Sequence, residues 1–315
     1  IRLLTERAKD AGVEIWPHHR FLGFEPVSGG LQLRIQNKLD KSLHELTTSN
    51  LVGADGAVSQ VASAAGIEHL PRVPLLQAIV EPNGGCDPTN VRVWFEPQQT
   101  AYFYWSIPES TKRAAVGFIA DDATTAKARL QGFLREQNLR PLQIQAARIP
   151  LFVAGRRPWK RIAGCDVYLV GDAAGHVKVT TVGGLVTGLW GAQAAAQAIQ
   201  DKSDYGKALR PLERELWLHG LIRRALNRFS PRDYQRLFDS IDDATALLLG
   251  RYSRDELAKM ALKLLFTQPR LLTFARHLIL PESNRNRHAL PAAPNGSMAP
   301  ATLQPATAPL QFEEK

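Results

Sequence analysis

The stretch Val167-Tyr-Leu-Val-Gly-Asp-Ala-Ala-Gly-His176 decides the fold that we expect of this chain. Val167 to Val170 are four apolar, β-compatible residues in a row, which predicts a buried strand. The strand runs into small residues, a turn follows, and the segment from Gly183 to Ile199 predicts a helix. Small residues let backbone N–H groups approach a bulky ligand, and the N-terminus of a helix favours anionic oxygens. Asp172, at the strand tip, can bind a sugar or polyol hydroxyl.

An earlier stretch repeats this strand-to-turn pattern. Leu51-Val-Gly-Ala-Asp-Gly-Ala-Val-Ser59 is an apolar strand that ends in Gly53, Asp55 and Gly56, followed by a predicted helix over 58–65. An Asp-Gly pair alone is a common turn dipeptide. Two such strand tips in one chain predict that Asp55 and Asp172 converge on a single ligand.

Together the two motifs resemble the DG and GD motifs of flavoproteins built like p-hydroxybenzoate hydroxylase. The version with Gly after Ala-Ala is most similar to the geranylgeranyl reductase family, and the resemblance extends over residues 1–240 or so. It implies that FAD is the cofactor, that Asp172 bonds its ribityl chain, and that Val182 lies in a turn near the flavin. The other FAD contacts that it implies are Gly53, Asp55, Gly56, Gly171, Ala173, Ala174, Gly175, Gly183 and Gly184.

The resemblance also implies an activity, the reduction of C=C bonds in an isoprenoid, geranylgeranyl-type substrate. Reduced FAD would deliver the hydride, with NAD(P)H or ferredoxin as the electron donor. No residue can be named as the proton donor. His176 either binds a phosphate, tunes the flavin or is an ordinary turn residue, and Lys178 lies in the same turn. Two alternatives stay open: a flavin-dependent monooxygenase or halogenase of the same fold, and a non-catalytic truncated remnant that binds lipid or serves as a scaffold.

Some positions depart from the family's pattern. Ala62 stands where the family has Arg, Val179 where it has Pro, and Val182 where it has Gly. A β-branched residue at 182 is stiff and places bulk near the flavin edge. No Gly-x-Gly-x-x-Gly run occurs, and residues 1–11 have the pattern of the late part of a helix. We therefore expect a chain that lacks the N-terminal βαβ unit of a longer flavoprotein.

The order of elements predicts an α/β fold with α+β insertions. It comprises a partial FAD-binding Rossmann-like domain, an inserted antiparallel substrate-binding sheet and a C-terminal helical region. The predicted divisions are 1–66 and 156–202 for the FAD-binding parts, 67–155 for the sheet, 203–280 for the helices and 281–315 for a disordered tail. Near the start, strands are expected at 13–16, 21–27, 31–36 and 42–48.

One strand of the inserted sheet is unusually aromatic. Phe103-Tyr-Trp-Ser-Ile-Pro108 resembles the Tyr-x-Trp-x-Phe-Pro strand of geranylgeranyl reductases and the Trp-x-Trp-x-Ile-Pro strand of flavin-dependent halogenases. Alternation would place Phe103, Trp105 and Ile107 on one face, with Tyr102, Tyr104 and Ser106 on the other. The first face either lines an apolar substrate tunnel or packs in the core of the sheet.

Charge, hydrophobic content and cysteine spacing limit the kinds of partner that we expect. The 315 residues carry a net charge of +9, and 44% of them are hydrophobic. This charge fits anionic lipid, a phosphorylated substrate or a plain basic surface, and no nucleic-acid motif accompanies it. Cys86 and Cys165 have neither metal-ligand spacing nor a disulfide framework, so we expect no metal and a cytoplasmic location. The apolar helical segment 261–280 either caps the substrate domain or makes a peripheral membrane contact.

Overall fold

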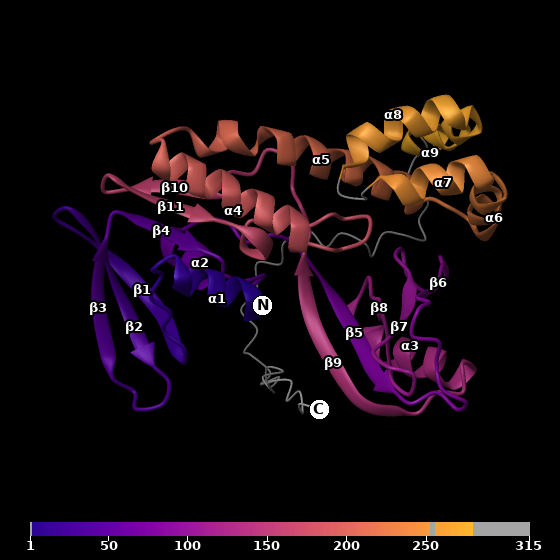
Figure 1. Cartoon of the computed structure of the whole chain (residues 1–315), viewed down its shortest axis with the longest axis horizontal. Coiled ribbons are helices and arrows are strands. Elements are labelled where there is room, and N and C mark those ends of the chain that lie inside the picture. Colours follow the sequence, from indigo (N-terminus) through magenta and orange to yellow (C-terminus); the bar gives the residue numbers. More distant parts are fainter. Residues whose placement is uncertain (1, 253–255, 280–315) are drawn as a thin grey trace.

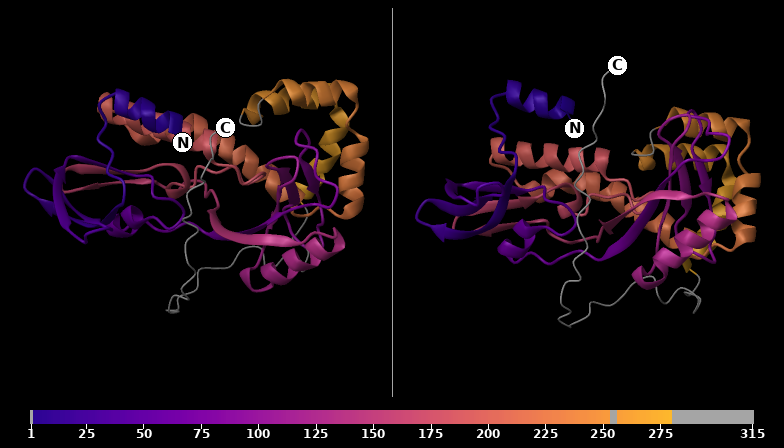
Figure 2. Two further views of the ribbon diagram at one scale, coloured as in Figure 1. Left: turned by 60° about the horizontal axis from the view of Figure 1, so that its bottom comes forward. Right: turned by 90° about the horizontal axis from the view of Figure 1, so that it is seen from below.

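The computed structural model describes residues 2–252 and 256–279, and within them it has a mixed α/β architecture with three sheets (Figure 1). The sheet of β1–β3 and the five-stranded sheet lie at opposite ends of the molecule, and two further views agree (Figure 2). Next to the β1–β3 sheet lies a small sheet that contains the two motif strands (Figure 1). The mixed α/β class is the one that the sequence predicted.

The first sheet is an antiparallel meander. Its strands are β1 (His19–Val27), β2 (Gly30–Asn37) and β3 (Leu43–Thr48), in that order. The three strands expected at 21–27, 31–36 and 42–48 are therefore present. The strand expected at 13–16 is absent from the described backbone, which follows helix α1 (Arg2–Asp10) with a turn and a coil. A strand exists through hydrogen bonds to a neighbour, and no described strand pairs with this segment.

The central sheet has the order β10–β11–β4, with β10 antiparallel and β4 parallel to β11. Its strands are β4 (Asn50–Gly53), β10 (Trp159–Ile162) and β11 (Cys165–Leu169). Helix α2 (Gln60–Ala65) follows β4, and a short 3-10 helix η1 (Gly171–Ala173) and then α4 (Leu185–Gln200) follow β11. Val167 and Leu169 have no exposed surface, because they pack against α2 and the meander. The buried strand predicted from the opening motif is confirmed.

The five-stranded sheet has the order β6–β7–β8–β5–β9 and is antiparallel throughout. Its strands are β5 (Arg72–Val80), β6 (Arg92–Trp94), β7 (Tyr104–Pro108), β8 (Ala114–Ile119) and β9 (Pro141–Pro150). Helix α3 (Ala123–Glu136) covers one face. There Tyr104 stacks between Phe118 at 4.6 Å and Phe133 at 4.2 Å, measured between ring centroids.

The expected alternation along β7 fails at its beginning. Tyr104 and Trp105 face opposite sides as predicted, but Tyr102 packs in the same cluster as Trp105 rather than with Tyr104. The reason is that pairing starts only at Tyr104, so Tyr102 belongs to a loop and does not follow the two-residue period of a strand.

The C-terminal region is helical. It comprises α5 (Tyr205–Leu226), α6 (Pro231–Asp239), α7 (Asp243–Arg251), α8 (Leu257–Thr267), a 3-10 segment η2 (Pro269–Ala275) and α9 (Arg276–Ile279). Helix α5 runs through Pro211 without restarting there, and a capping box at Ser230 starts α6. In the described parts of the chain, no helix is both long and apolar enough to cross a bilayer. The predicted tail 281–315 lies outside the described residues.

Candidate cofactor and substrate site

The two motif strands end side by side. β4 and β11 are parallel, Leu169 lies opposite Gly53, and the Val170 backbone N–H donates to the Gly53 carbonyl at 3.0 Å. The carboxyl ends of neighbouring parallel strands share one edge of a sheet, where open α/β folds bind ligands. The loops that carry Asp55 and Asp172 therefore start from the same edge.

Two glycines leave their backbone open at this edge. Gly56 has a φ of +83° and Gly171 a φ of +58°, a left-handed conformation that glycine adopts without steric cost. A Cβ added to either would meet no described atom within 4 Å. Gly53 has a different role, since a Cβ there would lie 2.8 Å from the Val61 and Leu169 side chains. Gly56 and Gly171 can thus face a ligand, whereas Gly53 permits close packing.

Helix α4 begins close to this open backbone. A Cβ on Gly188 would lie 3.3 Å from the Gly171 Cα, and one on Gly184 would lie 3.0 Å from a carboxylate oxygen of Asp172. Gly184 is the N-cap, and no side chain bonds the first-turn N–H groups. Those N–H groups and the positive end of the helix dipole are suited to anionic or carbonyl oxygens of a ligand. Gly183 lies just before this cap.

The two acidic residues have different surroundings. Asp55 accepts hydrogen bonds from the Ser59 hydroxyl at 2.6 Å and from the backbone N–H groups of Gln60 and Val61 at 2.6 and 3.0 Å. It therefore caps α2. The Asp172 carboxylate makes no hydrogen bond or ion pair with any described residue, and partial burial raises its pKa. Of the pair that the sequence put forward, Asp172 is the one available to a ligand.

The turn after Asp172 is packed rather than open. Ala173, Ala174 and His176 are buried, and Gly175 has a left-handed φ of +75° with Leu70 pressed against it. Burial, with a smaller contribution from the Arg156 cation, lowers the pKa of His176 to about 4. The described structure offers its buried Nδ1 no hydrogen-bond partner. His176 is a neutral core residue in this arrangement.

Arg156 is a residue that sequence interpretation missed. Its guanidinium donates to the Glu68 carbonyl, and also to the Ala174 carbonyl at 3.5 Å. It thereby links the loop after α2 to the turn after β11. The only local signal was a cation in the loop before β10, which is common on protein surfaces and does not reveal a tertiary contact.

The segment between η1 and α4 is a tight loop. The Lys178 N–H donates to the Gly183 carbonyl at 3.1 Å, and the Val182 N–H to the Lys178 carbonyl at 2.7 Å. Val182 has a φ of +51° and packs against the cluster that contains Tyr102 and Trp105. The Thr180 hydroxyl lies 2.7 Å from Nδ1 of His219 in α5. The loop therefore joins the motif turn to both the aromatic strand and the helical region.

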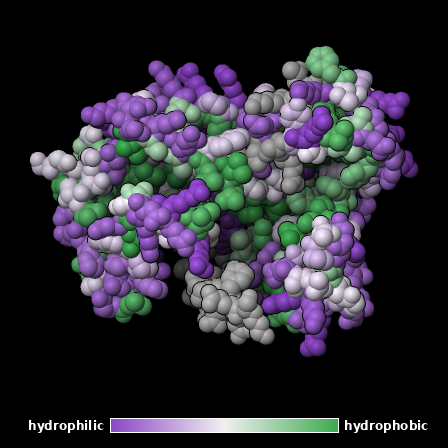
Figure 3. Space-filling view, viewed as in Figure 1, coloured by the Kyte–Doolittle hydropathy of each residue, from purple (hydrophilic) through white to green (hydrophobic). Residues whose placement is uncertain are grey.

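The predicted substrate-lining residues differ in exposure. Trp105 is 7% exposed and Phe103 is half-buried, with 6.1 Å between their ring centroids, whereas Ile107 is 44% exposed. Figure 3 shows apolar residues gathered at the centre of one face, between two lobes with largely polar outer surfaces. Phe103 and Trp105 belong to an apolar layer that also includes Tyr102 and Val182, whereas Ile107 is more exposed than either of them.

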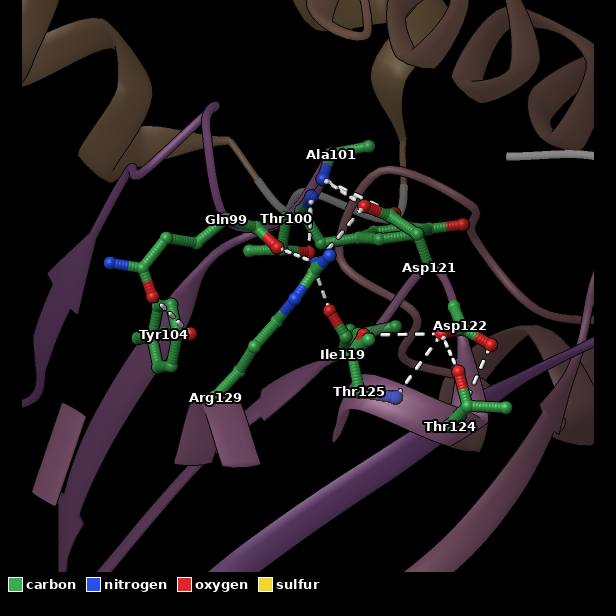
Figure 4. Close-up of polar contacts among 11 residues, drawn as sticks. Gln99, Thr100, Ala101, Tyr104, Ile119, Asp121, Asp122, Thr124, Thr125 and Arg129 are labelled. Carbon is green, nitrogen blue, oxygen red and sulfur yellow. Dashed lines mark hydrogen bonds and ion pairs between the residues drawn. The ribbon is translucent and has the colours of Figure 1, made fainter. Parts of the chain in front are cut away.

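The loop before β7 is held by a polar network (Figure 4). The Thr100 hydroxyl donates to the Ile119 carbonyl at 2.5 Å, and both Asp121 oxygens accept from the Ala101 N–H at 3.1 and 3.2 Å. Arg129 lies 4.0 Å from Asp121 and donates to the Gln99 carbonyl. These bonds fix the loop that presents Tyr102.

Within 2–252 and 256–279, no cluster of three or more His, Cys, Asp or Glu side chains could hold a metal ion.

Comparisons with known proteins agree with this geometry. No family model matches the sequence. The geranylgeranyl diphosphate reductase of Rhodobacter capsulatus is 29% identical over 249 residues, which cover 73% of this chain and 60% of that protein. The digeranylgeranylglycerophospholipid reductase 2 of Methanopyrus kandleri is 25% identical, over 88% of this chain and 75% of its own length. The chain thus spans three fifths to three quarters of these relatives.

Solved structures show the same fold. A geranylgeranyl bacteriochlorophyll reductase-like protein from Thermoplasma acidophilum superposes with a TM-score of 0.68 at 19% identity, over 88% of this chain and 73% of that one. The flavin-dependent halogenase CmlS superposes with a TM-score of 0.54 at 13% identity, over 86% of this chain and 59% of the other. The chain therefore has the fold of these reductase-like and flavin-dependent proteins. The two relatives in sequence are both named as isoprenoid-type reductases, and the geranylgeranyl bacteriochlorophyll reductase-like protein shares their fold with this chain.

Proposed function

We propose that this protein uses FAD to reduce C=C bonds of an isoprenoid substrate. The observation that carries the proposal is the shared edge of β4 and β11. There two left-handed glycines expose their backbone beside an unpartnered Asp172 and an uncapped helix. This combination suits a large ligand with hydroxyl and anionic oxygens.

The residues present fit one side of such a cofactor. The Asp172 carboxylate would accept a hydrogen bond from a hydroxyl of the ribityl chain. The N–H groups at the start of α4 would face flavin or phosphate oxygens. Gly184 and Gly188 keep α4 close to this edge, because a Cβ at either would crowd Asp172 or Gly171. Bound FAD would supply the hydride, and water or a protein group would supply the proton that completes the reduction. The residues of this chain would bind and orient the reactants.

The aromatic layer would hold the substrate. Trp105 and Phe103 lie in the same cluster as Val182, which belongs to the loop between Asp172 and α4. An apolar chain against these side chains would be kept dry and aligned beside the cofactor loop. We propose NAD(P)H or ferredoxin as the electron donor. A peripheral membrane contact of the apolar C-terminal helices, which would deliver a lipid substrate, is part of the same hypothesis.

A reductase is favoured over a monooxygenase or halogenase by the sequence relatives. The two sequence relatives described above are named as reductases, whereas the likeness to the halogenase is one of fold at 13% identity. Anaerobic turnover of an isoprenoid with a reduced flavin would support the reductase, and strictly oxygen-dependent product formation would favour the alternative.

The flavin assignment is tested with Asp172→Ala. The variant removes a hydrogen bond to a charged acceptor, which contributes roughly 1.5–3 kcal/mol, so FAD should bind about 10- to 100-fold more weakly. The measurement is a fluorescence titration with FAD, with the folded state checked by circular dichroism. Asp201→Ala, at the exposed opposite end of α4, should leave the affinity unchanged. Equal affinity of the Asp172 variant and the unmodified protein would contradict the assignment, and failure of the unmodified protein to bind FAD would favour a non-catalytic protein.

A further inference from the structure

A buried arginine lies between α5 and the five-stranded sheet. Arg223 is 6% exposed, and its guanidinium carbon lies 4.8 Å from the centre of the Tyr102 ring. The Tyr234 hydroxyl interacts favourably with this cation. Nε and Nη2, however, are buried without an acceptor among the described residues. A buried cation whose donors lack acceptors is costly, which indicates that an anion completes the site.

The carboxylate that interacts with this cation does not supply those acceptors. Asp121 interacts electrostatically with Arg223, but within the described chain it forms no ion pair with it. Its oxygens instead accept from the Ala101 N–H, and Arg129 lies 4.0 Å away (Figure 4). The Asp121 carboxylate therefore holds the loop that carries Tyr102, and the Arg129 cation offsets its charge.

A second donor in this layer is also unsatisfied. Nε1 of Trp105 is buried, and no described atom accepts from it. Trp105 and Tyr102 belong to one cluster, and Arg223 covers the Tyr102 ring. An indole N–H and two guanidinium nitrogens can only donate, so a ligand that satisfies them has to present several acceptor oxygens.

The surroundings of this donor set are aromatic and extend to the surface. The Phe95 ring stacks on Tyr234 at 4.9 Å and lies 6.0 Å from that of Phe103, with distances taken between centroids. Beyond them Phe238 is 48% exposed. From the surface to the interior, the side chains are therefore first apolar and then cationic. A ligand with an apolar chain and an oxygen-rich anionic end matches that order.

We propose that Arg223, with Trp105 and Tyr234, binds the phosphate-ester or diphosphate head group of an isoprenoid, and that its chain contacts Phe95 and Phe103. The identity of the ligand rests on the function proposed above, but its binding requires no flavin. Arg223 selects phosphorylated isoprenoids over the corresponding alcohols, because a guanidinium binds phosphate through paired charge-assisted hydrogen bonds.

The test compares two ligands with the same chain. Affinities for geranylgeranyl diphosphate and geranylgeraniol are measured by calorimetry on the full chain without added flavin. Arg223→Gln should weaken diphosphate binding by about tenfold or more and leave the alcohol unchanged. The matched control is Arg224→Gln, the same change of charge at the exposed neighbouring residue, which should affect neither ligand. Because flavin is omitted, a failure of the FAD titration leaves this result intact.

Each outcome decides the proposal. A loss confined to the diphosphate supports it. An equal loss for both ligands, or no loss, overturns it, since the arginine would then be a purely structural contact. Arg223-dependent binding of inorganic diphosphate without any contribution from the isoprenoid chain would assign the site to a free anion and overturn the lipid assignment. If Arg223→Gln does not fold, Arg223→Lys keeps a cation without the planar fork and is interpreted by the same criteria.

Discussion

Val182 is the most unusual residue of the motif loop. Its φ of +51° places a β-branched side chain in the left-handed region, where a non-glycine residue costs about 1–2 kcal/mol. Two backbone hydrogen bonds, at 2.7 and 3.1 Å, hold the loop in this conformation. The side chain packs against the cluster that contains Tyr102 and Trp105. The strain is thus offset by contact between the cofactor loop and the aromatic layer.

At position 182 the glycine variant should be more stable than the alanine variant, which reverses the usual order of stability. Val182→Ala loses the packing and keeps the strained backbone, whereas Val182→Gly loses the packing and relieves the strain. We expect the glycine variant to be more stable than the alanine variant by about 1 kcal/mol in urea unfolding. Val179, which is buried in the same loop and lacks a positive φ, is the control, and its glycine variant should be the less stable one. The same order at both positions would contradict the strain argument.

At the scale of the elements, helix α2 depends on its cap. It spans only Gln60–Ala65, and short helices are marginal without tertiary support. Ser59 caps it by accepting from the Ala62 N–H at 2.9 Å, and Asp55 accepts from Ser59 and two further N–H groups. Gly66 ends it with a left-handed φ of +60°. The DG motif therefore builds the helix that packs behind β4 and β11.

Asp55→Asn tests this structural role. The amide retains one acceptor oxygen in place of two, so at least one N–H or hydroxyl loses its partner. The free energy of unfolding should fall by about 1–2 kcal/mol in urea denaturation. Asp10→Asn, at the exposed end of α1, should change it by less than about 0.5 kcal/mol. A variant as stable as the unmodified protein, but unable to bind FAD, would instead show that Asp55 acts on the cofactor.

At the scale of the whole molecule, buried polar groups join the parts. The His176 ring lies so close to α4 that a Cβ on Gly191 would overlap it. The His176 backbone carbonyl accepts a hydrogen bond from the Thr187 hydroxyl at 2.5 Å. The Tyr205 hydroxyl of α5 donates to the Leu169 carbonyl at 2.9 Å. The contacts connect β11, α4 and α5 into one core, so the protonation of His176 bears on global stability.

His176 should make unfolding depend on pH. Its pKa is lowered to about 4 in the folded protein, against 6.5 in an unfolded chain, so between these values the unfolded chain binds the additional proton. Stability from His176 is therefore complete above pH 6.5 and falls as the pH drops, by an amount on the order of 3 kcal/mol at pH 4. Urea unfolding from pH 7 to 4.5 should show a weaker pH dependence in His176→Asn. The exposed His69→Asn should keep the original dependence, and identical profiles for all three proteins would refute the assignment.

Local patterns in the sequence determined the two strand–turn–helix motifs, the meander strands and the helical C-terminal region, because periodicity, glycine turns and caps act within a few residues. Only the tertiary structure decided the rest. It assigned Asp55 to a helix cap and left Asp172 without a partner, and it left 13–16 without a strand neighbour. It also brought Arg223 over Tyr102. Burial, desolvation and hydrogen-bond partners are set by residues distant in the chain, and no local pattern encodes which of those residues will meet.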